Sequence, residues 1–504
     1  MSAAARWVPV ESPSAQHRVP GFPHQFCTTE AAPFITDGGP RQKAISHMSP
    51  EPQQRRVPWP RLNRRQVLTG ALAGAGLLGA GFVTSSGTDF LAPARRTDPL
   101  RSATVAFTSG TAREGIGIEM AQHLEANSRV MPGIEDLGPA ARQQQFLDRC
   151  TAWITQLPEH RRDLATSALL DLWVLTDSLP ATVASWDRPW RYIWPRDAAF
   201  AAVALARVGM LDLAWQHLLH LQSLQSEDGS FAARFTPDLG LAPDERPSQF
   251  DALGLLLWAV SDVHAVGART TGRNEGVVAL ETMAPMLRRS SQRLLHLTER
   301  GTVLPPVSSD YWEVSESQVT LGTAGPTLLG LQALVRLAEH SSGLWDHIDG
   351  GADALGDSCN AFEATFSRTF IANGLQRYPT SGGLDSAVAY LPAAGAGLDL
   401  GESTLDHVWE RLRQPAGGIK PGHGWIFDHT SWTPSTSLMG VGFARIGATT
   451  QADGVLDWLG SHRTQAGSLP EKVSAEGAAV SVAPLSWTAS NVIITLDELH
   501  RPRS

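Results

Sequence analysis

The stretch DAAFAAVALARVGMLDLAWQHLLHLQSLQ, residues 197–225, shows the pattern that decides the fold. Its apolar residues return at steps of three and four, which is the spacing of amphipathic α-helices. Segments of the same kind follow one another from about residue 140 to the end of the chain, and we count ten to twelve of them. Strand-like alternation is scarce. The sequence therefore predicts an all-α fold.

The connections between these helical segments also follow a pattern. After every second segment comes a stretch rich in Gly, Pro and aromatic residues, at 186–197, 226–240, 303–317, 417–432 and 466–478. An up-and-down array with long loops at alternate turns fits a toroid of paired helices, in which the functional loops gather on one rim. Periodicity alone leaves an open solenoid as the alternative.

Composition narrows the class of protein. The chain has 504 residues, of which 42% are hydrophobic and 18% charged, enough for one large domain or two ordinary ones. The net charge of -9, without a basic tract in the folded part, argues against a nucleic-acid partner. Sixteen Trp against four Tyr indicate stacking surfaces as well as core.

Cysteine and histidine usage points to no cofactor. Cys27, Cys150 and Cys359 form neither a zinc pattern nor a disulfide framework. At most Cys150 and Cys359 could pair, and we expect free, buried thiols. His217 and His220 are expected on a helix surface. No metal cluster or nucleotide-binding loop is evident, so we predict an activity without metal or cofactor.

The first hundred residues differ from the rest. Residues 1–60 are rich in Pro, Ser, Gln and Arg and are predicted to be disordered, or to be a leader upstream of a true start at Met48. Arg64 and Arg65 then precede a glycine-rich apolar run, which resembles a twin-arginine export signal. LAPA at 91–94 offers a cleavage site.

These features predict an extracellular or cell-envelope location, with a membrane tether through the uncleaved signal as the alternative. The expected organisation is a leader at 1–60, a signal segment at 61–94, a linker with N-terminal helices at 95–160, and the main domain at 161–504.

Acidic residues stand beside aromatic rings in three of the loops. SSDYWEVSES, residues 308–317, places Asp310 and Glu313 around Tyr311 and Trp312. A solvated loop would use the acids alone and a core segment the rings alone. Carbohydrate sites use both, because sugar faces stack on rings and sugar hydroxyls bind carboxylates.

The other two loops allow simpler interpretations when taken singly. WRYIWPRDAAF places Arg196 and Asp197 at the start of a helix, where Asp197 could be a cap or a structural partner of Arg196. Glu471 in LPEKV could be a solvated turn residue. It is the combination of carboxylates and aromatics on one expected rim that indicates a site.

The motifs YIWPRD, SSDYWEVSES and SLPEKV…PLSW occur in the order seen in glycoside hydrolase family 15, the glucoamylase family, which the chain resembles over roughly residues 165–500. The resemblance implies an (α/α)6 barrel of six helical hairpins with catalytic loops on one rim. It also implies an enzyme that removes terminal glucose with inversion.

Inverting hydrolysis needs one protonated carboxylic acid and one carboxylate that activates water. By the resemblance, Glu313 matches the general acid and Glu471 the general base. Trp312 beside the acid would exclude water and help to keep its proton. The resemblance assigns substrate binding to Tyr192, Trp194, Arg196, Asp197, Gln249, Asp251, Asp310, Trp312 and Trp487.

Within this set the implied roles differ. Arg196 and Asp197 would grip the terminal glucose, and Trp194 and Trp487 would form walls of its pocket. Asp310 would line the neighbouring pocket. Gln249 and Asp251, in RPSQFDALG at 246–254, resemble a further sugar-contacting loop.

The chain also departs from the family pattern. Val314 stands where a second acid is usual, and Lys472 where glutamine is common. Lys420 could replace an arginine of the family, or His423 and Trp425 could reshape the rim. We therefore expect a short α-gluco-oligosaccharide, α-1,4- or α-1,6-linked, rather than raw starch. The alternatives are a trehalase, a catalytically silent glucan binder, and an interaction scaffold.

Overall fold

A computed structural model of the protein describes residues 99–270, 280–394, 398, 400–425 and 429–501. These residues belong to one compact unit. The predicted leader at 1–60 and signal segment at 61–94 lie outside the described residues, as does Cys27.

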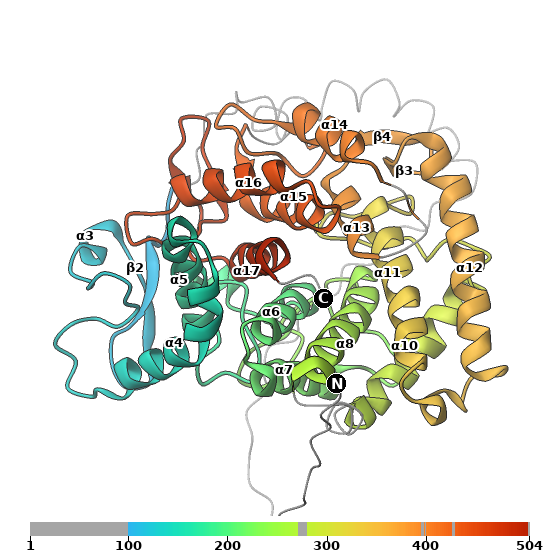
Figure 1. The fold of residues 1–504 in the computed structure, drawn as a ribbon, viewed down its shortest axis with the longest axis horizontal. Coiled ribbons are helices and arrows are strands. Elements are labelled where there is room, and N and C mark those ends of the chain that lie inside the picture. The colour runs from blue at the N-terminus through green and yellow to red at the C-terminus, as the bar shows by residue number, and fades with distance from the viewer. Residues whose placement is uncertain (1–98, 271–279, 395–397, 399, 426–428, 502–504) are drawn as a thin grey trace, which may run out of the picture. The chain divides into compact units, whose positions relative to one another are not determined.

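Six helical segments form a closed inner ring in which each packs against the next (Figure 1). In chain order they are α6 (Pro195–Arg207), α8 (Asp251–Thr270), α11 (Leu321–Ala338), η4 (Ser386–Ala389) continued by α13 (Tyr390–Ala394), α15 (Thr433–Arg445) and α17 (Ser486–His500). The ring closes because α17 packs against α6. The predicted all-α toroid is confirmed, and the open solenoid is excluded.

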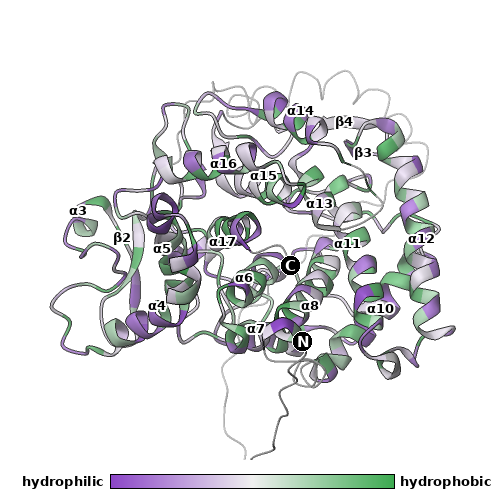
Figure 2. Ribbon diagram, in the orientation of Figure 1, coloured by the Kyte–Doolittle hydropathy of each residue, from purple (hydrophilic) through white to green (hydrophobic). Residues whose placement is uncertain are grey.

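Six further helices surround this ring. They are α5 (Glu159–Val174), α7 (Leu211–Leu224), α10 (Ala284–Leu297), α12 (Gly351–Thr369), α14 (Glu402–Leu412) and α16 (Thr449–Ser461). Among them, α10 is amphipathic: it buries Met286, Leu287 and Leu294 and turns Arg288 outward, so both colours appear on it in Figure 2. Inner helices are apolar almost all round, and every residue of α6 is buried.

Helix α8 illustrates what inner position does to composition. It is long and apolar enough to cross a membrane by length and hydropathy, yet 83% of its apolar window is buried inside the protein. Its Gly254 lets the backbone of α11 approach, since a Cβ there would lie 1.8 Å from the carbonyl oxygen of Pro326. This contact holds the start of α8, where Asp251 lies, close to the start of α11, which follows the 298–320 loop.

Within the part of the chain that the structure describes, six long loops gather at one end of the barrel. Each runs from the end of an outer helix to the start of the next inner helix, at 175–194, 225–250, 298–320, 370–385, 413–432 and 462–485. Turns such as 208–210 and 446–448 join inner to outer helices at the opposite end. Direction of the chain therefore places every long loop on the rim where the inner helices begin.

Small antiparallel sheets stiffen three of these loops. In the 370–385 loop, β3 (Gln376–Tyr378) pairs with β4 (Ser381–Leu384). Strand β6 (Lys472–Val473) lies between β5 (Ser431–Trp432) and β7 (Ala479–Val480), with Trp432 opposite Lys472. The sheet joins the 413–432 and 462–485 loops. It thereby fixes the position of Glu471, which directly precedes β6.

The segment before the barrel contains an element that was not expected. Strands β1 (Thr104–Phe107) and β2 (Arg113–Ile116) form an antiparallel hairpin, followed by α3 (Ile118–Ala121) and α4 (Gly138–Gln156), which packs against α5. The predicted linker with helices therefore also includes a sheet. Strands of four residues are too short for alternation to reveal them.

Two predictions about single residue types have opposite outcomes. Cys150 and Cys359 are free and buried, as predicted, and burial raises the pKa of each thiol to about 12. The surface position expected for His217 is wrong: it is fully buried between the Thr182 hydroxyl and the Leu213 carbonyl, both at 2.8 Å. Burial lowers the pKa of His217 to about 4, because it disfavours the charged imidazolium.

Candidate active site

A cavity of about 290 Å³ opens on the loop-bearing rim. Residues from five of the six long loops line it, together with the first turns of α6, α15 and α17. Seven of the residues predicted for the site lie on its wall: Trp194, Arg196, Asp197, Trp312, Glu313, Glu471 and Trp487. Loops that are far apart in sequence thus bring both predicted catalytic carboxylates into one cavity.

Glu471 directly precedes β6 and is 9% exposed. Its Oε1 accepts a hydrogen bond of 3.0 Å from Nε1 of Trp190, and its Oε2 one of 2.5 Å from the hydroxyl of Ser481. Ser481 has a φ of 71°, an uncommon value for a residue with a side chain. Glu471 is therefore an oriented, buried carboxylate, in contrast to a solvated turn residue.

Glu313 is held by two arginines. Nη2 of Arg196 lies 3.2 Å from its Oε1, and Nη1 of Arg246 lies 2.9 Å from its Oε2. The backbone of Glu313 has a φ of 56°, and left-handed backbone at such a residue costs about 1–3 kcal/mol. Strain of this kind persists only where the surrounding structure fixes the conformation.

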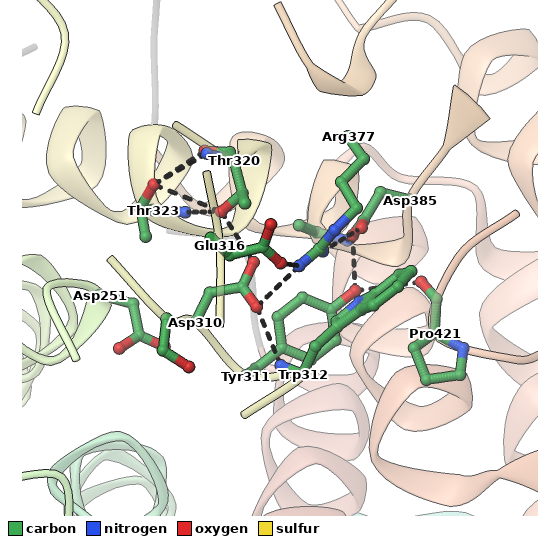
Figure 3. A network of polar contacts seen from close by, with 12 residues as sticks. Asp251, Asp310, Tyr311, Trp312, Glu316, Thr320, Thr323, Arg377, Asp385 and Pro421 are labelled. Carbon is green, nitrogen blue, oxygen red and sulfur yellow. Dashed lines mark hydrogen bonds and ion pairs between the residues drawn. The ribbon is translucent and has the colours of Figure 1, made fainter. Parts of the chain in front are cut away.

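The surrounding structure is a buried ion network centred on Arg377 of β3 (Figure 3). Its guanidinium pairs with Asp310 at 3.1 Å, Glu316 at 2.5 Å and Asp385 at 2.7 Å. It also lies over the Trp312 ring, 3.5 Å from the ring centroid. One cation from the 370–385 loop therefore fixes the segment on both sides of Glu313.

Further contacts fix the same segment. The Tyr311 hydroxyl donates to Asp385 Oδ1 at 2.5 Å, and burial raises the pKa of Asp385 although Arg377 opposes this effect. Gly422 leaves room for the indole of Trp312, because a Cβ at that position would lie 2.5 Å from it. Contacts with the 370–385 and 413–432 loops thus hold the segment that carries Glu313.

Four of the predicted substrate-binding residues, Tyr192, Gln249, Asp251 and Asp310, are not among the residues that line this cavity. Asp310 is fully buried, where it accepts from the Thr320 hydroxyl at 2.7 Å and pairs with Arg377. Tyr192 packs edge-on against Trp194, with ring centroids 5.9 Å apart. Asp310 thus holds Arg377 in place, and Tyr192 holds the ring of Trp194.

Gln249 and Asp251 likewise act on Arg196. Gln249 Oε1 accepts from Nη1 of Arg196 at 2.9 Å, and Asp251 Oδ2 lies 3.0 Å from the same nitrogen. Burial raises the pKa of Asp251 to about 6, with Arg196 acting in the opposite direction. The two residues orient the guanidinium that reaches Glu313.

Asp197, in the first turn of α6, faces the cavity beside Arg196, with Oδ2 3.6 Å from its Nε. Burial raises the pKa of Asp197 to about 7, and the nearby Arg196 lowers it only in part. A carboxyl with this weak ion pair can accept hydrogen bonds from ligand hydroxyls. The Arg196 guanidinium also lies 5.2 Å from the Trp487 ring centroid, which joins the two walls of the cavity.

Several residues that line the cavity were not predicted as site residues from the sequence: Trp190, Arg234, Arg246, Trp425 and Trp432. Signals existed for three of them, because Trp190 stands in the YIWPRD loop, Arg246 opens RPSQFDALG, and Trp425 was one of two alternatives for the rim.

Trp312, Trp425 and Trp432 form a row of edge-to-face rings, with centroids 5.2 and 5.1 Å apart. The Lys420 ammonium donates to the carbonyls of His423 and Trp425, at 3.3 and 3.2 Å, and so holds this loop. Lys420 therefore orders the loop that brings Trp425 to the cavity.

Comparison with known proteins agrees with this architecture. A glycosidase variant solved in complex with glucose has 22% identity and a TM-score of 0.55, over 68% of this chain and 99% of that chain. The glucoamylase of Saccharomycopsis fibuligera has 14% identity and a TM-score of 0.52, over 72% and 96%. A bacterial glucoamylase complexed with acarbose has 15% identity and a TM-score of 0.53, over 73% and 60%.

No protein-family model and no curated protein matches the sequence. At these identities the solved structures establish the fold, which is the (α/α)6 barrel of six-hairpin glycosidases. Two of the three are glucoamylases, so the fold agrees with the family 15 resemblance of the three loop motifs.

Proposed function

We propose that the protein is an exo-acting, inverting α-glucosidase that releases β-glucose from the non-reducing ends of short α-gluco-oligosaccharides. The observation that carries the proposal is the placement of Glu313 and Glu471, from different loops, in one tryptophan-lined cavity. Rings for stacking and carboxylates for hydroxyls are what a sugar requires.

In the proposed reaction, one carboxyl group acts on the leaving oxygen of the glycosidic bond and the other acts on the attacking water. Glu313, protonated, donates its proton to the glycosidic oxygen as the bond from that oxygen to C1 breaks. Glu471, ionised, takes a proton from a water whose oxygen bonds to C1 from the opposite face. Attack from that face inverts the anomeric centre.

The two glutamates have different partners. Glu471 accepts a hydrogen bond at each oxygen, from Trp190 and Ser481, and these contacts orient it toward a single position in the cavity wall. Glu313 is bound by a buried arginine, Arg196, and a half-exposed one, Arg246. An entering leaving group could displace Arg246, so that Glu313 meets the glycosidic oxygen there.

The size of the cavity supports a short substrate. Its volume of about 290 Å³ lies at the lower end for sites that enclose small ligands. Arg196 and Asp197 would bind hydroxyls of the terminal glucose, while Trp194 and Trp487 flank its ring. The α-1,4 and α-1,6 linkages both fit this proposal, with trehalose hydrolysis or glucan binding without turnover as the alternatives.

Separate Glu313→Gln and Glu471→Gln variants test the proposal. Each removes one proton-transfer group and keeps the side-chain shape, so we expect a loss of turnover of 10³-fold or more, on the order seen for essential catalytic groups. Binding of a short gluco-oligosaccharide, measured by calorimetry, should persist.

Glu476→Gln, an exposed glutamate on the same loop as Glu471, is the matched control and should retain full activity. Wild-type turnover in Glu471→Gln would contradict the assignment of the base. Ligand binding by a wild-type protein that turns over none of the substrates would favour the silent binder.

A further inference from the structure

The segment that leads into β1 lies against the loop that carries Glu471. The backbone N–H of Arg101 donates to the Ser481 carbonyl at 2.7 Å, and the Ser102 hydroxyl donates to the Ala483 carbonyl at 2.8 Å. The Thr464 hydroxyl donates to the Ala103 carbonyl at 2.6 Å. Residues 101–104 are therefore bonded along the outside of the 462–485 loop, far from them in sequence.

Arg101 contacts both of the groups that donate hydrogen bonds to Glu471. Its N–H binds the backbone of Ser481, whose hydroxyl binds Glu471 Oε2. Its guanidinium lies 5.5 Å from the centroid of the Trp190 ring, whose Nε1–H binds Glu471 Oε1. Nη1 of Arg101 also lies 3.4 Å from Oδ2 of Asp187, on the same loop as Trp190.

The Arg101 side chain is 47% exposed and contributes little to the core. The two groups it touches, in contrast, need support. Ser481 holds an uncommon left-handed backbone, and Trp190 is only partly buried at the cavity wall. A contact that fixes both donors narrows the orientations that the Glu471 carboxylate can adopt.

We propose that Arg101 is a positioning residue for the base, which it fixes from outside the barrel through Trp190 and Ser481. This inference rests on the proposed function of Glu471. It makes the amino-terminal segment a part of the active site's support. A cut after the predicted cleavage site at 91–94 would keep this support, whereas a chain shortened beyond residue 101 would lose it.

The variant Arg101→Ala tests the side-chain part of this role. It removes the guanidinium from Trp190 and keeps the backbone hydrogen bond to Ser481. We expect kcat to fall about tenfold with little change in KM, because Glu471 acts on water and not on substrate binding.

Two further variants separate positioning from general structural effects. Arg101→Lys keeps a cation over the ring and should restore most of kcat. Arg191→Ala is the matched control: its guanidinium lies 5.4 Å from the Trp186 ring on the same loop, but the Trp186 indole N–H donates to the Arg113 carbonyl. It should leave kcat and KM unchanged.

A double-mutant cycle supplies the decisive comparison. Trp190→Phe removes the indole donor, so Arg101→Ala should have little additional effect on kcat in that background. Full additivity, or an equal loss of kcat in Arg191→Ala, would overturn the role of Arg101. If Glu471→Gln is inactive while Arg101→Ala matches wild type, this inference alone fails; if Glu471→Gln keeps full turnover, the proposed function fails and the inference with it.

Discussion

At the scale of single residues, the proposed acid and the proposed base are held by different kinds of partner. Glu313 binds two guanidinium groups, and Glu471 binds an indole and a hydroxyl. A proton donor must present an oxygen to the glycosidic oxygen. Arg246, the more exposed of the two arginines, should therefore compete with substrate for Glu313.

Arg246→Gln tests this competition. It removes the half-exposed guanidinium 2.9 Å from Glu313, which also pairs with Asp244 at 3.2 Å, and leaves Arg196 in place. Substrate then no longer has to displace this ion pair, so KM for a short gluco-oligosaccharide should fall by up to about fivefold, the equivalent of an exposed ion pair. Initial-rate kinetics of the purified variant is the measurement.

Arg300→Gln provides the matched control, because its exposed guanidinium pairs with Asp349 at 3.9 Å, apart from the cavity residues. Its KM should equal that of the wild type. An unchanged or raised KM in Arg246→Gln would contradict the competition between Arg246 and substrate.

Asp197 gives a prediction about stability. Its pKa is about 7 in the folded protein against 3.8 for the free side chain, chiefly because of burial. Between these pH values the folded state holds a proton that the unfolded chain has released, so wild-type stability falls as pH rises through the interval. Relative to Asp197→Asn, the wild-type free energy of unfolding should fall by up to ~4 kcal/mol from pH 4 to pH 7.

Denaturant unfolding of both proteins across that pH range checks the prediction. A constant offset between them cancels in the comparison. An Asp349→Asn variant, altered at a fully exposed carboxyl, should follow the wild-type pH dependence. If the difference in unfolding free energy between wild type and Asp197→Asn does not change with pH, the folded protein does not hold a proton on Asp197 across this range.

At the scale of elements, the acid loop depends on a hairpin that makes no direct contribution to the cavity wall. Arg377 in β3 is the shared partner of Asp310, Glu316 and Asp385. Arg377→Met would leave three buried acids without their common cation. We expect the free energy of unfolding to fall by about 3–5 kcal/mol, as when one partner of a buried ion pair is removed.

Urea denaturation of Arg377→Met measures this loss. The comparison is Arg413→Met, since Arg413 pairs with Glu410 at 3.8 Å and both side chains are mostly exposed. Pairs of that kind contribute roughly 0–1 kcal/mol. A similar small change in both variants would show that the network around Arg377 does not hold the acid loop.

Which elements the sequence reveals depends on their length. Helices of 13 to 20 residues, such as α6 and α8, contain several turns of apolar period and were predicted. The β-hairpins have strands of two to four residues, and the 370–385 loop has Arg377 and Asp385 without a tryptophan beside them. Nothing local marks such a loop as part of a sugar site.

The same reasoning applies to the site. Glu313, Glu471, Trp194 and Trp487 line the cavity and could be selected from the sequence because they stand in three ordered motifs that combine acids with aromatic residues. Asp310 was found too, but whether a carboxyl faces a cavity or an arginine behind it is decided by tertiary packing. The partnership of Arg246 with Glu313 joins two loops, and spacing along the chain does not encode it.

At the scale of the whole molecule, the course of the chain around the closed ring explains why the long loops and the cavity lie on the same rim. Each inner helix begins at this rim, so Asp197, Asp251 and Trp487 stand in or near first turns that converge on the cavity. Helix starts carry partial positive charge, which favours the carboxylates placed there. The twin-arginine-like segment leads us to propose that this barrel is exported already folded.

The central claim is inverting hydrolysis of a short α-glucan, and the anomer of the first product tests it most directly. Maltose, isomaltose, trehalose and a longer maltodextrin would each be incubated with the protein while proton NMR follows the released glucose. The account predicts an early excess of β-glucose from at least one of the three glucans, or equal amounts of α- and β-glucose from trehalose, followed by mutarotation. More α- than β-glucose at early times would contradict inversion and the roles given to Glu313 and Glu471.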